Sequence, residues 1–552
     1  MAAIQQILLG MGGSGSDFYW FNRLNYGSQT GNYDHQQYYC CNGSTDDDND
    51  DVFVAGNRSY YKSSSNYRWQ AIYLRLDTEG AIQAQINFAT AGSYTATYGT
   101  GCIVQKYSDQ NYQSGTEQKY VLIGGRDNTH QFARCNVSNL AVQGQDSFRA
   151  AEGPNDNQNT MVAPKRGFRW SGGVGGGVNN ETLSCFYYGG RTIGKAAFSS
   201  NPSSSFNQNN ACSEYNPVTR RMITVNFYGS SYYQSPNIAG IDFEPGTNSY
   251  NPSNNEWDNV APFIYEISTY HNVTNTTAQK GYRCHVQRSR GYGTFTDASK
   301  SGGAGAWRQS KSTFTDGAGV QMRGGGSGTK CDTSYAYHCG YHNNNASTQV
   351  RGWVMKWDGD GNVSWTKEIT DNGGEEDGNQ KVRLTAIELD DDGCTYVVGY
   401  SYVTSTRQKG IIMKFNANGT VAWQNVFYKT SSNANSVVYF NGIRRNQLGS
   451  LIIYGWLRDD TQATPGDSSS TQAQHPQGVV MKVAQDGSGT GIVGDYTYAS
   501  SSFGVGNMGN TWADLNNSAA NYQSNYLYCY RNYGENKDNN VTMASAVTTT
   551  TM

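Results

Sequence analysis

Three oxygen-bearing side chains at alternate positions are the first candidates for chemistry in this sequence. The stretch "WDGDGN" places Asp358, Asp360 and Asn362 two residues apart, the spacing that begins an oxygen-ligand calcium loop. Such a loop continues to a glycine and a bidentate glutamate, whereas here "VSW" begins a strand. The pattern predicts a hairpin turn, with a structural calcium ion as the alternative and no other cofactor.

Two further stretches concentrate carboxylates: "DDDNDD" (46–51) and "LDDDG" (389–393). Carboxylates crowded this closely repel one another, and a bound cation would relieve the repulsion. Both stretches also stand where a turn between two strands belongs. We expect solvated turns here, with calcium binding again the alternative.

Two histidines flank a cysteine in "YHCGYH". On a strand, His338 and His342 would point to one face about 13 Å apart, too far to share a metal ion directly. Ordinary strand packing is therefore expected for both.

Motifs of catalysis are missing from the sequence. It has no nucleophile elbow, Walker loop, dinucleotide-binding fingerprint or HExxH pair, and the glycine-rich 172–177 lacks the setting of a phosphate loop. We therefore expect no enzyme. Acidic pairs that meet only in the folded chain leave a glycosidase or lyase as an alternative.

Aromatic residues make up 13% of the chain, and tyrosine dominates in polar stretches such as 57–69, 229–237 and 520–534. Tyrosine offers rigid contact area with a polar tip, which suits interfaces with sugars or proteins. Cross-strand aromatic packing is the simpler interpretation of most individual tyrosines.

Composition limits the classes of partner. The 552 residues include 65 glycines, only 15% are charged, and the formal net charge is −3. Nucleic acid is not expected as a partner, because phosphate binding needs a clustered basic excess. No apolar run is long enough to cross a membrane, and the N-terminus lacks the pattern of a secretory signal. The 11 cysteines show no CxxC pair, so most are expected to be buried, reduced strand residues.

The strands and turns that carry these side chains can be recognised from a sequence pattern that occurs four times. Its copies are "IYLRLDTEGAI", "WVMKWDGDGNV", "IIMKFNANGTV" and "VVMKVAQDGSG". In each copy a glycine stands five positions after the basic residue, which is Arg75, Lys356, Lys414 or Lys482. An alternating strand must reverse, and glycine supplies the positive φ that hairpin turns demand. The phrase therefore predicts β-hairpins.

A second phrase precedes each copy. It is a short, nearly continuous apolar strand ending near glycine: "DVFVAG", "SYAYHCGY", "CTYVVGY" and "LIIYGW". Such strands suit burial on both faces. The clearest unit, 383–427, reads as four antiparallel strands in about 45 residues, which is one propeller blade.

These units predict an all-β fold, a β-propeller of seven or eight four-stranded blades with irregular loop insertions. Residues 1–16 would form an N-terminal arm and 17–549 a single propeller. Clear blades are expected at about 34–90, 317–369, 382–428 and 436–498, with a diverged region over 100–316. A closing blade at about 509–547 would be completed by an N-terminal strand, 17–24.

The phrase "KFNANGTVAWQ" with "DDDGCTYVVGY" upstream resembles the β-propeller repeats of bacterial surface and phage proteins. Separately, "MAAIQQILLGMGGSGS" resembles the opening of virion structural proteins from marine tailed phages. The resemblance implies a tail, tail-fibre, baseplate or decoration role in the virion, made in the host cytoplasm without a signal peptide.

We therefore expect a non-enzymatic virion structural protein that uses its propeller to dock other virion proteins or a host-surface glycan or protein. It would bind no nucleic acid and insert in no membrane. The first alternative is a bacterial extracellular or surface propeller that binds glycans or proteins, and the next is a propeller glycosidase or lyase.

Overall fold

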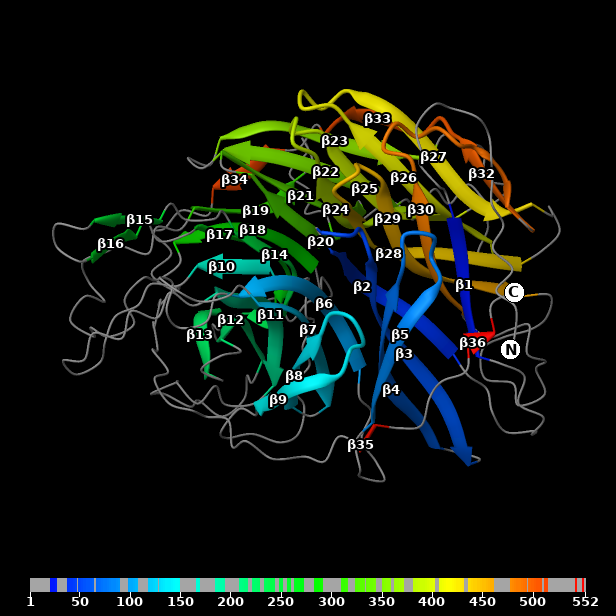
Figure 1. The fold of residues 1–552 in the computed structure, drawn as a ribbon. Helices are drawn as coiled ribbons and strands as arrows, with labels where there is room; N and C mark the ends of the chain where they lie inside the picture. Colours follow the sequence, from blue (N-terminus) through cyan, green and yellow to red (C-terminus); the bar gives the residue numbers. More distant parts are fainter. Residues whose placement is uncertain are drawn as a thin grey trace.

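The computed structural model contains β-strands and no helix among the residues it describes (Figure 1). Those residues are 20–26, 37–46, 48–63, 66–89, 98–107, 118–127, 129–148, 165–168, 184–193, 208–216, 221–228, 233–243, 248–251, 256–259, 263–272, 282–290, 309–315, 323–332, 334–343, 350–358, 362–371, 381–402, 407–430, 435–460, 477–493, 495–508, 511–514, 542–543 and 549–550. They form seven antiparallel sheets of four or more strands and one two-stranded ribbon. The predicted all-β class is confirmed.

The first half of the chain supplies sheets 1 to 4, numbered in chain order. Sheet 1 holds β2 (Gln37–Thr45), β3 (Val52–Ser63), β4 (Asn66–Leu76) and β5 (Ile82–Ala89). Sheet 2 holds β6 (Tyr98–Tyr107), β7 (Gln118–Asp127), β8 (Thr129–Asn136) and β9 (Val142–Phe148). Sheet 3 holds β10 (Lys165–Phe168), β11 (Ser184–Ile193), β12 (Gln208–Asn216) and β13 (Arg221–Tyr228). Sheet 4 holds β14 (Tyr233–Phe243), β17 (Phe263–Asn272), β18 (Tyr282–Arg290) and β19 (Gln309–Thr315), with the ribbon β15 (Asn248–Asn251) and β16 (Glu256–Asn259) between its first two strands.

The second half supplies sheets 5 to 7. Sheet 5 holds β20 (Arg323–Cys331), β21 (Tyr335–Asn343), β22 (Val350–Asp358) and β23 (Val363–Thr370). Sheet 6 holds β24 (Val382–Leu389), β25 (Thr395–Tyr402), β26 (Gln408–Phe415) and β27 (Val421–Lys429). Sheet 7 holds β28 (Asn435–Arg445), β29 (Leu451–Asp460) and β30 (Gln477–Val483). The diverged region of the sequence thus contains sheets 2, 3 and 4.

The fourth strand of sheet 7 comes from the N-terminus, which corrects the predicted closure. Strand β1 (Trp20–Tyr26) pairs antiparallel with β30, with Trp20 opposite Lys482. The expectation placed this strand in a closing blade at 509–547 and gave the blade at 436–498 four strands of its own. The described parts of 509–547 instead join two different sheets, so they do not form one blade. Residues 1–19 and 515–541 lie outside the described part of the chain.

Short strands from the C-terminal segment line the outer edges of five sheets. They are β31 (Gly491–Val493) with β32 (Tyr496–Ser500) on sheet 6, β33 (Gly504–Asn507) on sheet 5, β34 (Thr511–Asp514) on sheet 4, β35 (Thr542–Met543) on sheet 1 and β36 (Thr549–Thr550) on sheet 7. The described strands of this segment therefore join sheets 6, 5, 4 and 1 in the reverse of their chain order, and then sheet 7. Each of these contacts pairs the C-terminal part of an outer strand, as in Lys367–Thr370 of β23. Exposed sheet edges invite pairing with other chains, and these strands cover part of each edge.

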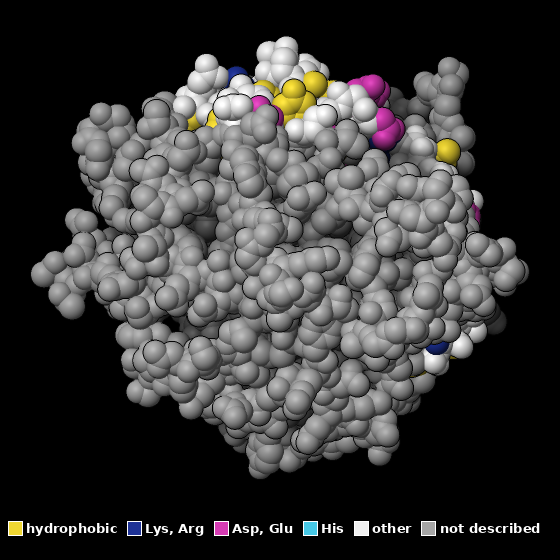
Figure 2. Space-filling model, turned by 90° about the vertical axis from the view of Figure 1, so that its left-hand side faces the viewer, with side chains coloured by type: hydrophobic (Ala, Val, Ile, Leu, Met, Phe, Trp, Pro, Cys, Tyr) yellow, Lys and Arg dark blue, Asp and Glu magenta, His cyan; other side chains and the backbone are white. Residues whose placement is uncertain are grey.

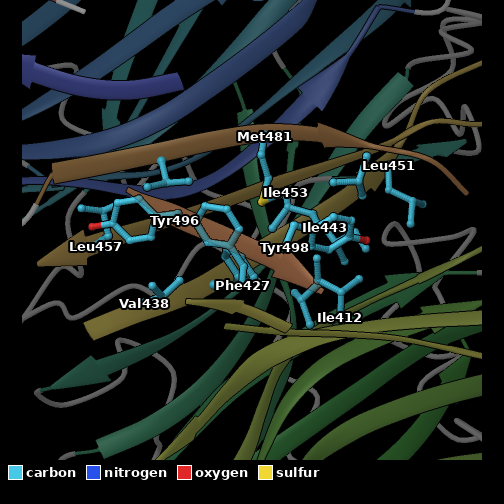
Figure 3. Packing of buried hydrophobic residues seen from close by; sticks show 14 of the residues in the cluster. Ile412, Phe427, Val438, Ile443, Leu451, Ile453, Leu457, Met481, Tyr496 and Tyr498 are labelled. Carbon is cyan, nitrogen blue, oxygen red and sulfur yellow. The ribbon is translucent and has the colours of Figure 1, made fainter. Parts of the chain in front are cut away.

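The sheets pack face against face, and the core lies between neighbours. Sheet 6 meets sheet 7 in one apolar cluster that includes Ile412, Phe427, Val438, Ile453 and Met481 (Figure 3). Similar clusters join sheets 5 and 6, 7 and 1, and 1 and 2. Burying each such side chain contributes about 1.5–3 kcal/mol. The neighbour contacts run without a break from sheet 3 through 4, 5, 6 and 7 to sheets 1 and 2.

Glycines in the predicted turns adopt the positive φ that the sequence pattern predicted. Gly80, Gly419 and Gly487 all have φ near +80°. In all three turns the glycine N–H donates to the carbonyl three positions back, that of Asp77, Asn416 or Ala484. The hairpin predictions are confirmed for β4 with β5, β22 with β23 and β26 with β27. The fourth was wrong, because β31, the strand after Gly487, pairs with β32, and β30 pairs with β29 and β1. Gly361 lies outside the described residues.

On three outer strands, β23, β27 and β1, a tryptophan donates a hydrogen bond to the glycine turn of the next sheet. The Nε1 of Trp365 (β23) donates to the carbonyl of Ala417 at 3.0 Å, and that of Trp423 (β27) donates to Gln485 at 3.1 Å. Trp20 on β1 donates in the same way to Thr78 at 2.8 Å. Each acceptor stands two residues before the turn glycine. Strand β1 therefore occupies in sheet 7 the position that β23 and β27 occupy in their sheets.

The first strands of neighbouring sheets are also tied together by polar contacts. Lys330 (β20) and Arg444 (β28) both approach Glu388 (β24), at 2.9 and 3.5 Å. The Nε of Arg444 continues to the carbonyl of Gly43 (β2) at 2.9 Å. These linked polar contacts thus connect sheets 5, 6, 7 and 1.

Sheet 2 shows why the diverged region concealed its repeats. The turn between β8 and β9 is closed by Leu140, which has a φ of 57° without being glycine. The N–H of Leu140 donates to Asn136 at 2.9 Å. The glycine signal is missing from the sequence because this longer turn places an ordinary residue in the left-handed region.

The surface, the cysteines and the expectation of no membrane-spanning helix can also be compared with the structure. On the face in Figure 2, described side chains gather along the upper edge, where apolar atoms lie beside acidic ones. Cys102, Cys135, Cys331 and Cys339 are buried free thiols, as predicted for most cysteines. Within the described part of the chain, no helix has the length and apolar character needed to cross a membrane.

Candidate functional site

The predicted calcium ligands sit at the hairpin between β22 and β23. Asp358 Oδ1 accepts the backbone N–H of Asn362 at 2.8 Å, and Oδ2 accepts its side-chain Nδ2 at 3.0 Å. Asp360 lies outside the described residues. The two described members therefore close the turn, and calcium binding by this trio stays a prediction. No group of three or more His, Cys, Asp or Glu side chains is arranged to hold a metal ion in the part of the chain that is described.

The acidic stretch 389–393 forms the turn between β24 and β25. Oδ2 of Asp390 accepts the Tyr396 hydroxyl at 2.9 Å and meets Lys414 Nζ at 3.4 Å, while Oδ1 accepts the N–H of Cys394 at 2.8 Å. Burial alone would raise the pKa of Asp390, but these three partners hold it below its usual value. Asp390 is thus an ionised structural carboxylate, and Lys414, the basic residue of the repeated phrase, is its counterion.

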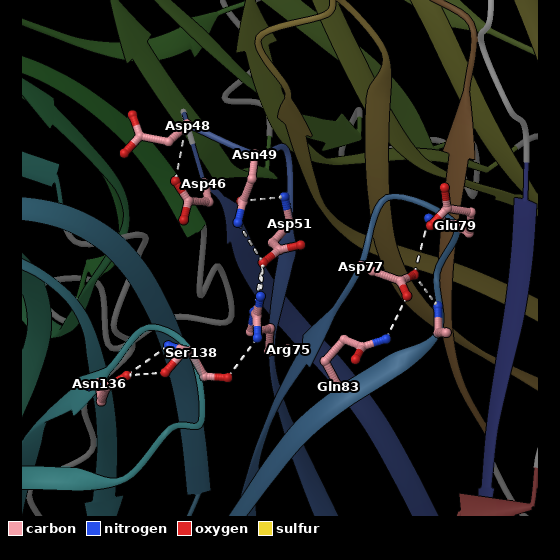
Figure 4. Close-up of polar contacts among 11 residues, drawn as sticks. Asp46, Asp48, Asn49, Asp51, Arg75, Asp77, Glu79, Gln83, Asn136 and Ser138 are labelled. Atoms are coloured by element: carbon pink, nitrogen blue, oxygen red, sulfur yellow. Dashed lines mark hydrogen bonds and ion pairs between the residues drawn. The ribbon is translucent and has the colours of Figure 1, made fainter.

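The stretch 46–51 forms the equivalent turn of sheet 1 (Figure 4). Asp51 accepts Arg75 Nε at 2.6 Å, and Arg75 Nη1 reaches the carbonyl of Ser138 in sheet 2, also at 2.6 Å. Asp50 Oδ1 accepts the N–H of Gln447 in sheet 7 at 3.0 Å. The carboxylates therefore join three sheets through protein donors. Asp47 lies outside the described residues.

His338 and His342 are both buried in sheet 5 and have separate partners, as expected. His338 contacts Thr329 Oγ1 at 2.9 Å through Nδ1 and accepts Trp357 Nε1 at 2.8 Å through Nε2. His342 Nε2 lies 2.9 Å from Glu368, which also accepts Arg351 at 2.6 Å. These are packing interactions between strands of one sheet.

An aromatic cluster at the opposite end of sheets 5 to 7 is the most promising site. In sheet 6, this end holds the start of β24 and the end of β25, away from the turn that contains Asp390. Tyr400 of β25 lies 4.2 Å from Tyr439 of β28, and Tyr439 stacks on Trp456 of β29 at 5.2 Å, centroid to centroid. Tyr402 meets Tyr400 at 5.7 Å. Tyr439 and Trp456 are only half-buried, so the stacked rings reach the surface.

Two cations flank the rings, and both come from the start of the first strand of sheet 6. The Arg383 guanidinium lies over the ring of Tyr341, 4.5 Å from its centroid. Lys381 Nζ lies over the ring of Tyr402 at 5.3 Å. Cations are attracted to the negative faces of aromatic rings, which fixes both side chains beside the stack. We call Tyr341, Lys381, Arg383, Tyr400, Tyr402, Tyr439 and Trp456 the aromatic–cation cluster.

Tyr400, Tyr439 and Arg383 keep their charge states at ordinary pH. Burial raises the pKa of Tyr400 and Tyr439, so both hydroxyls stay protonated. Burial alone would lower the pKa of Arg383, but its tyrosine neighbours, Tyr400 first, leave that pKa above its usual value. The cluster therefore offers flat neutral rings and a permanent positive charge. Such a combination of aromatic rings and a cation is suited to holding a ligand.

Sequence reasoning missed this cluster, although its signal was present. Tyr341, Tyr400 and Trp456 each follow the glycine that ends a second-strand phrase. A Cβ at Gly399 would collide with the carbonyl of Arg383, and one at Gly455 with that of Tyr439. Glycine lets the second strand approach the first at a β-bulge, and the aromatic residue after it is thereby presented at the same end of each sheet.

Comparisons with known proteins place the chain in no family. No protein-family model matches it, and no curated protein matches it. Among solved structures, Drosophila Semaphorin 2a is similar at a TM-score of 0.41 and 10% identity, over 84% of this chain and 75% of that chain. A similarity this distant carries no argument about function.

Proposed function

We propose that the seven sheets are the blades of one β-propeller. Each sheet contributes four consecutive antiparallel strands, with the N-terminal strand completing the seventh. The contacts that run from sheet 3 through sheet 7 to sheets 1 and 2 support a ring, and the proposal adds its closure between sheets 2 and 3.

We further propose that this propeller is a non-enzymatic structural protein of a tailed-phage virion, in its tail, fibre, baseplate or decoration. The observation that carries the docking role is the aromatic–cation cluster, a rigid binding surface held by three adjacent sheets. The strands over the outer edges favour the same role, because they limit uncontrolled edge pairing where copies are crowded. The resemblance of the N-terminus supplies the virion context. Partners would be other virion proteins and a host-surface glycan or protein.

Cryo-electron microscopy of the undissociated particles tests this proposal. Density for the chain at fixed symmetric positions on a phage particle is the expected result, and its contacts would separate docking from host-facing surfaces. Free monomers, or an assembly without a capsid, would overturn the virion role.

The aromatic–cation cluster equally favours a bacterial surface module that binds glycans. Fractionation separates the two functions, since a virion protein sediments with capsid and tail subunits and an exported module appears with the cell surface. The same antibody against the chain serves both fractions.

A further inference from the structure

The cluster pairs stacked rings with cations that have no carboxylate partner. By contrast, Lys330 and Arg444 pair with Glu388, and Lys414 pairs with Asp390. Among the described residues, no carboxylate lies within ion-pair distance of Lys381 or Arg383, and Arg383 Nε has no hydrogen-bond acceptor. Two acids at the same end are already engaged, Asp371 by Lys409 at 3.0 Å and Glu368 by Arg351 at 2.6 Å.

A half-buried cation without a counterion favours an anionic ligand. Removal from water weakens its hydration, and a charged acceptor restores the lost interaction. The Arg383 fork suits the planar geometry of a carboxylate in particular. The positive charges of Arg383 and Lys381 therefore favour a ligand that carries a carboxylate.

The aromatic rings of the cluster indicate the uncharged part of that ligand, a sugar ring. Tyr439 and Trp456 lie nearly parallel, with 12° between their planes, and both are half-buried. Tyr439 is held between Tyr400 and Trp456, so only the exposed parts of the half-buried rings offer apolar surface to a ligand. The C–H groups of a sugar can pack against this surface, while tyrosine hydroxyls can meet its hydroxyl groups.

We propose that the aromatic–cation cluster binds an acidic carbohydrate, with a sugar ring against the exposed parts of Tyr439 and Trp456 and its carboxylate on Arg383 and Lys381. This inference rests on the proposed attachment role and names the class of ligand for it.

Calorimetry of the full chain with oligogalacturonate tests the inference, with neutral dextran oligosaccharides and polyglutamate as comparison probes. We expect oligogalacturonate to bind at least ~10-fold more tightly than either, with an affinity that falls as salt rises. Lys381→Gln combined with Arg383→Gln should weaken this binding at least ~10-fold. Arg445→Gln is the matched control, because that arginine pairs with Asp391 at the other end of the sheet, and it should bind as the unaltered chain does.

Three results would overturn the inference: binding of dextran as tight as oligogalacturonate, equal binding of polyglutamate, or unchanged binding by the double variant. Lys381→Gln alone, at a half-exposed position, keeps the test valid if the double variant fails to fold, and should itself weaken binding. Failure here would leave particle association intact, whereas failure of the virion role would show in the microscopy and leave sugar binding intact.

Discussion

The indole of Trp20 donates a hydrogen bond to the carbonyl of Thr78, 58 residues later, and so ties the N-terminal strand of sheet 7 to sheet 1. Two residues on, Asn22 Nδ2 donates to the carbonyl of Gly80. Trp423 and Asn425 hold the turn of Gly487 in the same way. The Trp-x-Asn pair is therefore a repeated clasp between neighbouring sheets.

Loss of the Trp20 clasp should destabilise the whole fold, because it joins sheet 7 to sheet 1, the last and the first sheets in chain order. We expect Trp20→Phe to lower the free energy of unfolding by ~1 kcal/mol through the lost hydrogen bond, and Trp20→Ala by about 3–5 kcal/mol through the cavity as well. Urea unfolding followed by tryptophan fluorescence and circular dichroism measures both. Equal stability of the two variants would contradict this role.

Substitution of the turn glycine should be costly only where φ is positive and a ring lies close. A Cβ at Gly419, φ 81°, would stand 2.9 Å from the Trp365 ring. We expect Gly419→Ala to lower stability by more than ~1 kcal/mol. Gly491→Ala is the control, since nothing lies within 4 Å of its Cβ. If both changes had the same effect in thermal unfolding, the turn geometry would not be the cause.

Stability should fall on acidification because of His338. Burial lowers its pKa to about 3, while the unfolded chain protonates the same group near pH 6.5. The unfolded state then binds the extra proton, so the free energy of unfolding should fall by up to ~1.4 kcal/mol per pH unit below that point.

Unfolding of the unaltered chain and His338→Gln between pH 7 and 5 measures the histidine effect. Glutamine keeps an acceptor for Trp357 and does not titrate, so the variant should show the smaller slope. Identical slopes would contradict the prediction. Glu368 and Asp390 have lowered pKa values despite burial, because of His342 and Arg351 in one case and of the Cys394 N–H, Tyr396 and Lys414 in the other. Their contribution is lost at lower pH, as these carboxylates protonate.

Removal of the outermost C-terminal strands should promote self-association. A chain that ends at residue 508 keeps β31 to β33 but uncovers the C-terminal parts of β19, β5 and β1. We expect dimers or larger species in light scattering after size exclusion, with little change in secondary structure, because uncovered edges accept strands from other copies. An equally monomeric truncated chain would show that the short strands do not protect these edges.

Three of the four hairpins and the class of fold could be predicted from the sequence. Alternation of apolar and polar residues defines a strand locally, and the turn of Gly419 requires a φ that glycine adopts without strain. Strands and turns can therefore be predicted from a few neighbouring residues. The buried strand 395–402 and the carboxylate turn before it could be predicted for the same reason.

Only the tertiary structure decided which edges the two chain ends join and where the aromatic–cation cluster lies. Edge pairing is made by backbone groups that every residue carries, so β1 and β33 give no sequence signal for their partners. Lys381 and Trp456 meet one cluster because sheets 6 and 7 pack face to face, a relationship set by the burial of side chains far apart in the chain.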